Sequence, residues 1–178
     1  MRIISGLHKG RRILTPKNLP VRPTTDKAKE ALFNILIHNY DFVNRNALDL
    51  FAGTGSISYE FASRGMSEIT AVDQNYLCVN FITKTSNNLS LPINVFKQSV
   101  EKFLKHQLKS FDFIFADPPY SYTLEQYYNL INLIFTNSMQ NKNGLFIIEH
   151  TEKLDLSSSG YFIKSKNYGG CVFSFFAH

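Results

Sequence analysis

Residues 48–58 read Leu-Asp-Leu-Phe-Ala-Gly-Thr-Gly-Ser-Ile-Ser, and this stretch decides the fold that the sequence predicts. Its first residues have the apolar character of a buried strand, and Gly53 and Gly55 separate that strand from a stretch with helical spacing. A glycine turn between a strand and a helix lets the backbone approach a ligand closely, because glycine has no Cβ. The stretch therefore predicts a ligand site of the nucleotide-binding type at the end of a first strand.

Apolar runs and helical stretches alternate on the C-terminal side of this junction. We expect strands at residues 47–51, 69–72, 93–96, 111–116 and 145–148, and helices near residues 56–64, 75–89, 100–108 and 123–136. Strands that are apolar on both faces and alternate with helices indicate a parallel, doubly wound sheet. Residues 161–167 and 171–176 flank a Tyr-Gly-Gly turn, which predicts a closing antiparallel hairpin and a mostly parallel α/β sheet of seven strands.

The N-terminal segment has a different pattern. Residues 2–4 and 11–14 surround a glycine-containing turn and predict a β-hairpin, whereas the three prolines in residues 15–23 predict a linker that is not helical. A capping segment at residues 24–26 precedes apolar residues with helical spacing from Ala28 to Leu36. We therefore expect two parts: a basic hairpin arm with its linker at residues 1–23, and one domain at residues 24–178.

The positive charge of the chain is concentrated at the N-terminal end. Residues 1–30 contain eight basic and two acidic side chains, which leaves 11 basic and 12 acidic side chains for the other residues. A basic arm on a nearly neutral body is typical of a protein that binds a polyanion, although a solvated basic tail has the same composition. The arm residues that we expect to contact phosphates are Arg2, Lys9, Arg11 and Arg12.

The composition excludes several classes of protein. With 178 residues, 44% hydrophobic and 19% charged, the chain has the size and composition of one globular domain rather than of a disordered chain. No apolar run approaches the ~18 residues of a membrane span, and the first residues lack the apolar core of a signal peptide. Cys78 and Cys171 have no metal-ligand spacing. We therefore expect a cytoplasmic protein that uses no metal and contacts no membrane.

An acidic residue follows the second predicted strand. Asp73 lies 18 residues beyond Gly55, close to the offset of about 20 residues at which an acid binds a ribose in dinucleotide sites. The third glycine of the dinucleotide fingerprint is replaced by Ser58, which makes a nicotinamide cofactor less favourable. The sequence therefore favours a different ribose-bearing cofactor.

The sequence Asp117-Pro118-Pro119-Tyr120 follows the fourth predicted strand, at the edge where open α/β sheets bind ligands. Two prolines restrict the backbone, so the Asp117 carboxylate and the Pro118 carbonyl are held as two fixed hydrogen-bond acceptors. Tyr120 adds a flat ring on which a planar ligand can stack. Two acceptors and a stacking ring suit the exocyclic amine of a nucleobase, whereas the alternative is a proline-rich turn with Tyr120 in the core.

Residues 49–55, Asp73 and residues 117–120 resemble motifs I, II and IV of the class I S-adenosylmethionine-dependent amino-methyltransferases. The segments 2–6, 9–11, 22–27 and 30–34 are similar to the arm of the RsmD family, whose members methylate the N2 amine of a guanine in bacterial 16S ribosomal RNA. The resemblance covers the whole chain. It implies a Rossmann-like class I methyltransferase fold and an enzyme that acts on 16S rRNA, within an assembling small ribosomal subunit. We also expect the protein to be a monomer.

The resemblance also implies roles for individual residues. Asp117, Pro118 and Tyr120 would be catalytic. Arg22, Thr24 and Thr25 resemble the segment that closes over the cofactor and the substrate guanine. S-adenosylmethionine would be held by residues at the ends of the first three strands: Asp49, Phe51, Gly53, Thr54 and Gly55, with Asp73 on the ribose and Ser99 at the adenine.

Three alternatives share part of this pattern. A DNA adenine-N6 methyltransferase also has Asp-Pro-Pro-Tyr, but this chain has no insertion large enough for a sequence-reading domain. A protein glutamine methyltransferase usually has Asn-Pro-Pro-Tyr and gives the basic arm no obvious role. A non-catalytic RNA-binding module would need the arm, but it gives no reason for the glycines, Asp73 and Asp117 to occur together.

Overall fold

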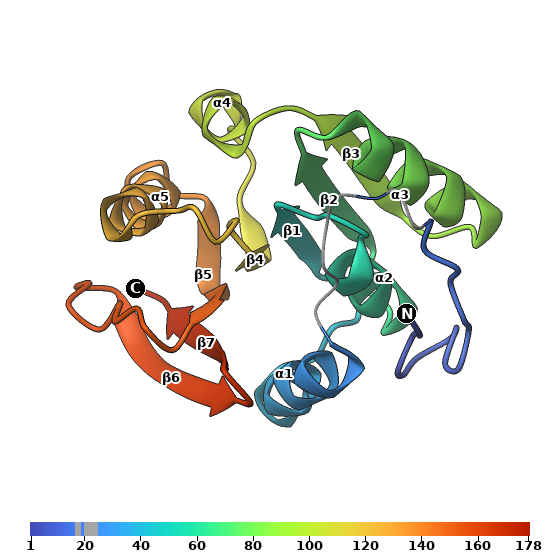
Figure 1. The fold of residues 1–178 in the computed structure, drawn as a ribbon, viewed down its shortest axis with the longest axis horizontal. Helices are drawn as coiled ribbons and strands as arrows, with labels where there is room; N and C mark the ends of the chain where they lie inside the picture. Colours follow the sequence, from blue (N-terminus) through green and yellow to red (C-terminus); the bar gives the residue numbers. More distant parts are fainter. Residues whose placement is uncertain (17–18, 20–24) are drawn as a thin grey trace.

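The computed structural model describes residues 1–16, 19 and 25–178, and it contains a seven-stranded sheet within those residues (Figure 1). The strands are β1 (Asn46–Leu50), β2 (Glu68–Asp73), β3 (Ile93–Lys97), β4 (Phe111–Ala116), β5 (Gln140–Thr151), β6 (Phe162–Tyr168) and β7 (Cys171–Phe176). They are arranged in the order β3-β2-β1-β4-β5-β7-β6. Strands β1 to β5 pair in parallel, whereas β7 is antiparallel to both β5 and β6. The predicted fold class is confirmed.

Helices cover both faces of this sheet. They are α1 (Asp26–Asn39), α2 (Ser56–Ser63), α3 (Tyr76–Asn88), α4 (Val100–His106) and α5 (Leu124–Thr136). Leu48 and Leu50 of β1 point toward a core shared with α4 and α5, and Ala47 points toward a core shared with α1 and α2. Because alternate residues of a strand face opposite sides, a strand buried on both sides must be apolar almost throughout. This is the pattern that the sequence shows.

Strand β5 begins earlier than the strand that the sequence predicts at residues 145–148. It starts at Gln140, which pairs with Phe111, and a bulge follows before Phe113 pairs with Leu145. The polar sequence Gln-Asn-Lys-Asn-Gly is typical of a turn, which is why the prediction missed these residues. The glycine is required by close packing, because a Cβ on Gly144 would lie 2.9 Å from the carbonyl oxygens of both Asn141 and Asp112.

The arm folds back on the domain. Arg2 and Arg12 form an isolated antiparallel bridge, and the Ile3 N–H donates to the Arg11 carbonyl at 3.0 Å, so the predicted hairpin is present as a short pairing rather than as two strands. Ile3 and Ile13 are buried against α2 and α3, beside which the arm lies in Figure 1. The linker prediction falls largely on residues 17–18 and 20–24, which lie outside the described residues.

A buried ion network joins the arm to two helices. Lys29 of α1 lies 3.3 Å from a carboxylate oxygen of Glu60 on α2, and both side chains are almost completely buried. Glu60 also accepts from the backbone N–H of Ile4, and Lys29 donates to the carbonyl of Arg2 at 2.7 Å. Arg64 completes the network at 3.3 Å from Glu60. The arm is therefore held by backbone hydrogen bonds and by the buried Ile3 and Ile13, whereas the side chains of Arg11 and Arg12 are exposed.

None of the helices in the described part of the chain is both long enough and apolar enough to cross a bilayer.

Candidate active site

A cavity of about 820 Å³ opens at the carboxyl ends of β1, β2, β4 and β5. It is the crevice in which open α/β sheets bind ligands. Nine of the residues that the sequence assigns to the site line it: Thr25, Asp49, Phe51, Gly53, Thr54, Asp73, Asp117, Pro118 and Tyr120. Residues that are up to 95 positions apart in the chain therefore meet in one place, as the motif assignment requires.

Two residues assigned to the cofactor site have other positions. Gly55 precedes α2 with a φ of 76°, and it does not line the cavity; a Cβ there would lie 2.9 Å from the ring of Tyr59. Ser99 caps α4 by accepting from the backbone N–H of Lys102, and the two residues after it, Val100 and Glu101, line the cavity in its place. Arg22 and Thr24 lie outside the described residues.

The loop between β1 and α2 is held by Asp73. One carboxylate oxygen accepts from the backbone N–H of Gly53 at 2.8 Å, and the other accepts from the N–H of Asn75 at 2.7 Å. Phe51 begins the loop with a φ of 59°, which is strained for a residue with a side chain, and Gly53 has a φ of 55°. Strain of this kind is found at functional sites, where the surrounding structure holds it.

Asp49 lies beneath this loop and is nearly inaccessible to solvent. It accepts from both the backbone N–H of Ser58, at 3.0 Å, and the Ser58 hydroxyl, at 2.5 Å. Burial raises the pKa of Asp49 to about 7, because the loss of hydration of the carboxylate outweighs the two hydrogen bonds that favour its charged form. The nearby charge of Asp73 raises this pKa further.

Ser56 is a lining residue to which the sequence pattern assigned no role. Its hydroxyl is buried at the first residue of α2 and has no hydrogen-bond partner in the described part of the protein. A buried hydroxyl without a partner is unfavourable, and a polar ligand group in the cavity would satisfy it. Its position directly after the glycine turn is the sequence signal that would have found it.

Asp117 and Pro118 follow β4 and line the cavity. Burial raises the pKa of Asp117 well above its ordinary range, and the negative charges of Glu149 and Asp49 raise it further. The Tyr120 side chain is 82% exposed at the edge of the cavity, so the alternative in which this tyrosine belongs to the core is wrong. Asp117, Pro118 and the exposed Tyr120 therefore line the same cavity.

The far wall of the cavity is formed by residues that the sequence did not single out as functional. Tyr127 of α5 and His150 of β5 are buried and line it, and their rings are in edge-to-face contact with centroids 6.3 Å apart. The two nitrogens of His150 are engaged with the Thr151 carbonyl and the Ser174 hydroxyl, each at 2.8 Å. Burial lowers the pKa of His150, so the ring is uncharged at neutral pH.

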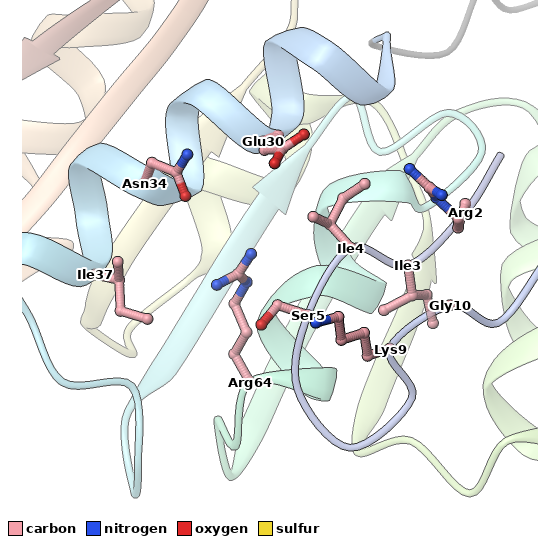
Figure 2. A pocket seen from close by; sticks show the side chains of 10 residues that line it. All are labelled: Arg2, Ile3, Ile4, Ser5, Lys9, Gly10, Glu30, Asn34, Ile37 and Arg64. Carbon is pink, nitrogen blue, oxygen red and sulfur yellow. The ribbon is translucent and has the colours of Figure 1, made fainter.

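A second cavity of about 390 Å³ lies between the arm and α1 (Figure 2). Arg2 and Lys9 of the arm line it, together with Glu30 and Asn34 of α1. Figure 2 shows Arg64 extending between the arm and α1, where its guanidinium lies 4.6 Å from the centre of the Phe33 ring. This groove is more polar than the first cavity and carries a surplus of positive charge.

Within the described residues, no group of three or more His, Cys, Asp or Glu side chains has the arrangement of a metal site. The polar groups of the larger cavity are instead those of a site for an organic ligand: carboxylates, a hydroxyl, backbone groups and aromatic rings.

The order of the strands, the glycine turn after β1 and the acid after β2 define a class of protein, the Rossmann-like methyltransferases. A candidate SAM-dependent methyltransferase of Streptococcus mutans shares this fold, with a TM-score of 0.68 over 84% of this chain and 48% of that one at 17% identity. A candidate methylase of Haemophilus influenzae superposes over 98% of this chain and 96% of its own, with a TM-score of 0.77 and 31% identity.

The chain belongs to the family described as conserved hypothetical protein 95, whose model matches residues 1–177. A curated relative from Haemophilus influenzae is named ribosomal RNA small subunit methyltransferase D, and it is 34% identical over 86% of this chain and 79% of its own. The resemblance of the motifs and the arm to the RsmD family is therefore confirmed.

Proposed function

We propose that this protein transfers a methyl group from S-adenosylmethionine to the exocyclic N2 amine of a guanine in 16S ribosomal RNA. Membership of its family and the fold of its relatives support rRNA methylation with this cofactor. The choice of an amine on a base rests on one observation, that Asp117 and Pro118 both line the cavity, where their carboxylate and carbonyl can serve as two acceptors. We further propose that the protein acts in the cytoplasm as a monomer, on an assembling small subunit.

The residues around the glycine loop fit the cofactor. Gly53 and Thr54 line the cavity, and the Ser56 hydroxyl has no hydrogen-bond partner among the described residues. Asp73 lies at the end of β2, and we propose that it binds the ribose. When bound, S-adenosylmethionine supplies a methyl group on a positively charged sulfur. Asp49 lies at the floor of the same cavity, where its negative form would favour that positive charge.

The chemistry at the amine follows from its electronic structure. The lone pair of the guanine N2 atom is delocalised into the ring, which makes the amine a poor nucleophile. Hydrogen bonds from its two N–H groups to the Asp117 carboxylate and the Pro118 carbonyl favour a pyramidal nitrogen with an available lone pair. The same acceptors stabilise the positive charge that develops on the nitrogen as the new N–C bond forms and the S–C bond breaks. The methylated ammonium then loses a proton to solvent.

Two features support an RNA rather than a small molecule as the substrate. The exposed Tyr120 ring can stack on a base that has left its helix and replace part of the lost stacking. Arg11 and Arg12 are exposed on the arm, and Arg2 and Lys9 line the groove beside α1. We propose that residues 1–23, including Arg22, form an RNA-binding arm beside a methyltransferase domain at residues 24–178, with Thr24 and Thr25 near the substrate.

The test is mass analysis of nucleosides after incubation with isotopically labelled cofactor. Naked rRNA, assembling small subunits and duplex DNA are supplied in parallel. We expect labelled N2-methylguanosine in rRNA from the small-subunit sample. Labelled N6-methyladenine in the DNA sample would support the adenine methyltransferase instead, and no label in any nucleoside would reject the proposal.

A further inference from the structure

Asp117 and Glu149 follow paired residues of two adjacent parallel strands. Ala116, the last residue of β4, pairs in register with Ile148 of β5; Asp117 directly follows β4, and Glu149 is the next residue of β5. Residues in register on neighbouring parallel strands project to the same side of the sheet. Both acidic residues line the larger cavity, so the structure places two carboxylates side by side on one wall of the site.

The contacts around Glu149 are consistent with this placement. The charge of Glu149 raises the pKa of Asp117, and the charges of Asp117 and Glu149 together raise the pKa of Tyr127, after burial, to about 12. Glu149 also accepts from the Cys171 thiol, with 3.2 Å between sulfur and oxygen. A carboxylate can accept several hydrogen bonds, so this contact leaves capacity for a ligand donor.

Two neighbouring acceptors select a ligand with two neighbouring donors. Guanine has such an edge, because its N1–H and N2–H groups are adjacent. Adenine and cytosine each have an amine next to a ring nitrogen that is itself an acceptor. Placing that ring nitrogen against a second carboxylate would leave two buried acceptors facing each other, which is unfavourable.

We propose that Glu149 accepts the N1–H of the target guanine while Asp117 accepts its N2–H, so that Glu149 is the residue that distinguishes guanine from the other amino-bearing bases. This inference rests on the proposed function, because it assigns the second donor of the same base.

Glu149 could instead serve only to hold β7 through the Cys171 thiol. The two roles make different predictions for a base analogue. 2-Aminopurine has the same exocyclic amine at C2, but its N1 is an acceptor. If the Glu149 carboxylate accepts the N1–H, the enzyme must favour guanine over 2-aminopurine. A Gln at position 149 must accept both bases, because an amide can turn either its oxygen or its NH₂ group toward the base.

The experiment compares methyl transfer to small-subunit RNA that carries either guanine or 2-aminopurine at the target position, introduced by ligating a synthetic segment. We expect the wild type to favour guanine in kcat/KM, and Glu149→Gln to reduce that preference by about tenfold or more. Cys171→Ala is the matched control, because it removes the thiol contact and keeps the carboxylate. It should leave the preference at the wild-type value.

The outcomes separate this inference from the proposed function. If the wild type transfers no methyl group to guanine N2, the proposed function is wrong. If it methylates guanine but Glu149→Gln keeps the wild-type preference, only the role of Glu149 is wrong. Calorimetric cofactor binding checks that Glu149→Gln is folded. If Glu149→Gln does not fold, the test is the preference of the wild type for guanine over 2-aminopurine. Equal kcat/KM values of the wild type on these two bases would overturn the role of Glu149.

Discussion

The carboxylate of Asp73 accepts a hydrogen bond from the backbone N–H of Gly53, with 2.8 Å between oxygen and nitrogen. The bond connects the end of β2 to the loop after β1. It gives a physical reason why a glycine turn after the first strand is accompanied by an acidic residue at the end of the second strand. Asp73 therefore has two tasks in the proposed site. It shapes the loop that receives the methionine part of the cofactor, and it is available to the ribose.

Replacing Asp73 with Ala should weaken cofactor binding by about 1.5–3 kcal/mol, the range for a lost hydrogen bond to a charged group. The loss has two sources, the ribose contact and the loosened Gly53 loop. Calorimetric titration with S-adenosylmethionine measures it. An affinity equal to that of the wild type would remove Asp73 from the site.

Glu60→Gln should destabilise the protein by about 3 kcal/mol, because it removes the buried carboxylate that pairs with both Lys29 and Arg64 and leaves Lys29 only the partly exposed Asp26, 3.9 Å away. The matched control is Glu68→Gln. Glu68 forms an ion pair with Lys109 in which both side chains are 41% exposed, and such surface pairs contribute about 0–1 kcal/mol. Urea unfolding of both variants measures the difference. Equal midpoints and slopes for the two variants would show that the arm network does not stabilise the fold.

The stability of the protein should depend on pH through Asp49. Burial raises its pKa to about 7 in the folded protein, from an ordinary value of 3.8 that applies to the unfolded chain. Between these values the folded state holds a proton that the unfolded state has released. The stabilisation that comes from the proton on Asp49 is therefore complete below the pKa of this residue in the unfolded chain. It is lost as the pH rises through the pKa of Asp49 in the folded protein.

Asp49→Asn removes this titration. Relative to the variant, the wild type should lose about 2–3 kcal/mol of unfolding free energy between about pH 5 and pH 8, at about 1.4 kcal/mol for each pKa unit. Urea unfolding across that range gives both curves. Parallel curves would mean that Asp49 is ionised in the folded protein at all of these pH values.

Neutralising Arg11 and Arg12 together should weaken RNA binding and leave cofactor binding unchanged, because both side chains are exposed on the arm and neither lines the larger cavity. Each lost phosphate contact should also flatten the slope of log affinity against log salt by roughly 0.7–0.9. A double substitution of Lys105 and Lys142, two exposed lysines outside the arm, controls for net charge. Equal affinities and slopes for the wild type and the arm variant would mean that the arm is a solvated tail.

Much of the fold could be predicted because the sequence satisfies local rules. Apolar runs of strand length located β1 to β4 within one residue at each end, and the helices predicted near residues 56–64, 75–89, 100–108 and 123–136 correspond to α2 to α5. The start of β5 could not be predicted in this way. Its first residues have turn chemistry, and they form a strand only because β4 provides a partner across a bulge.

The residues of the candidate site also differ in how far local sequence patterns predict them. Gly53, Asp73 and Asp117 lie at strand ends in recognisable motifs, so their convergence follows from the parallel topology. Glu149 has no motif, and its place beside Asp117 depends on the register between β4 and β5, which no short pattern encodes. The close packing of Gly6 could not be predicted either. A Cβ on this residue would lie 1.7 Å from the carbonyl oxygen of Ser63 in α2, and this contact forms only when the chain folds.

If the Asp117 carboxylate activates the amine, methyl transfer to small-subunit rRNA must depend on this side chain, which Asp117→Ala removes. We expect kcat to fall by roughly 10²–10³-fold or more, because a preorganised acceptor acts mainly on the charge of the transition state. Cofactor affinity should stay within a few-fold of the wild type. In the wild type, log kcat should rise with pH as Asp117 loses its proton, above the ordinary aspartate range, because burial and Glu149 raise its pKa. Wild-type turnover by Asp117→Ala on the same rRNA would show that the Asp117 carboxylate does not activate the amine.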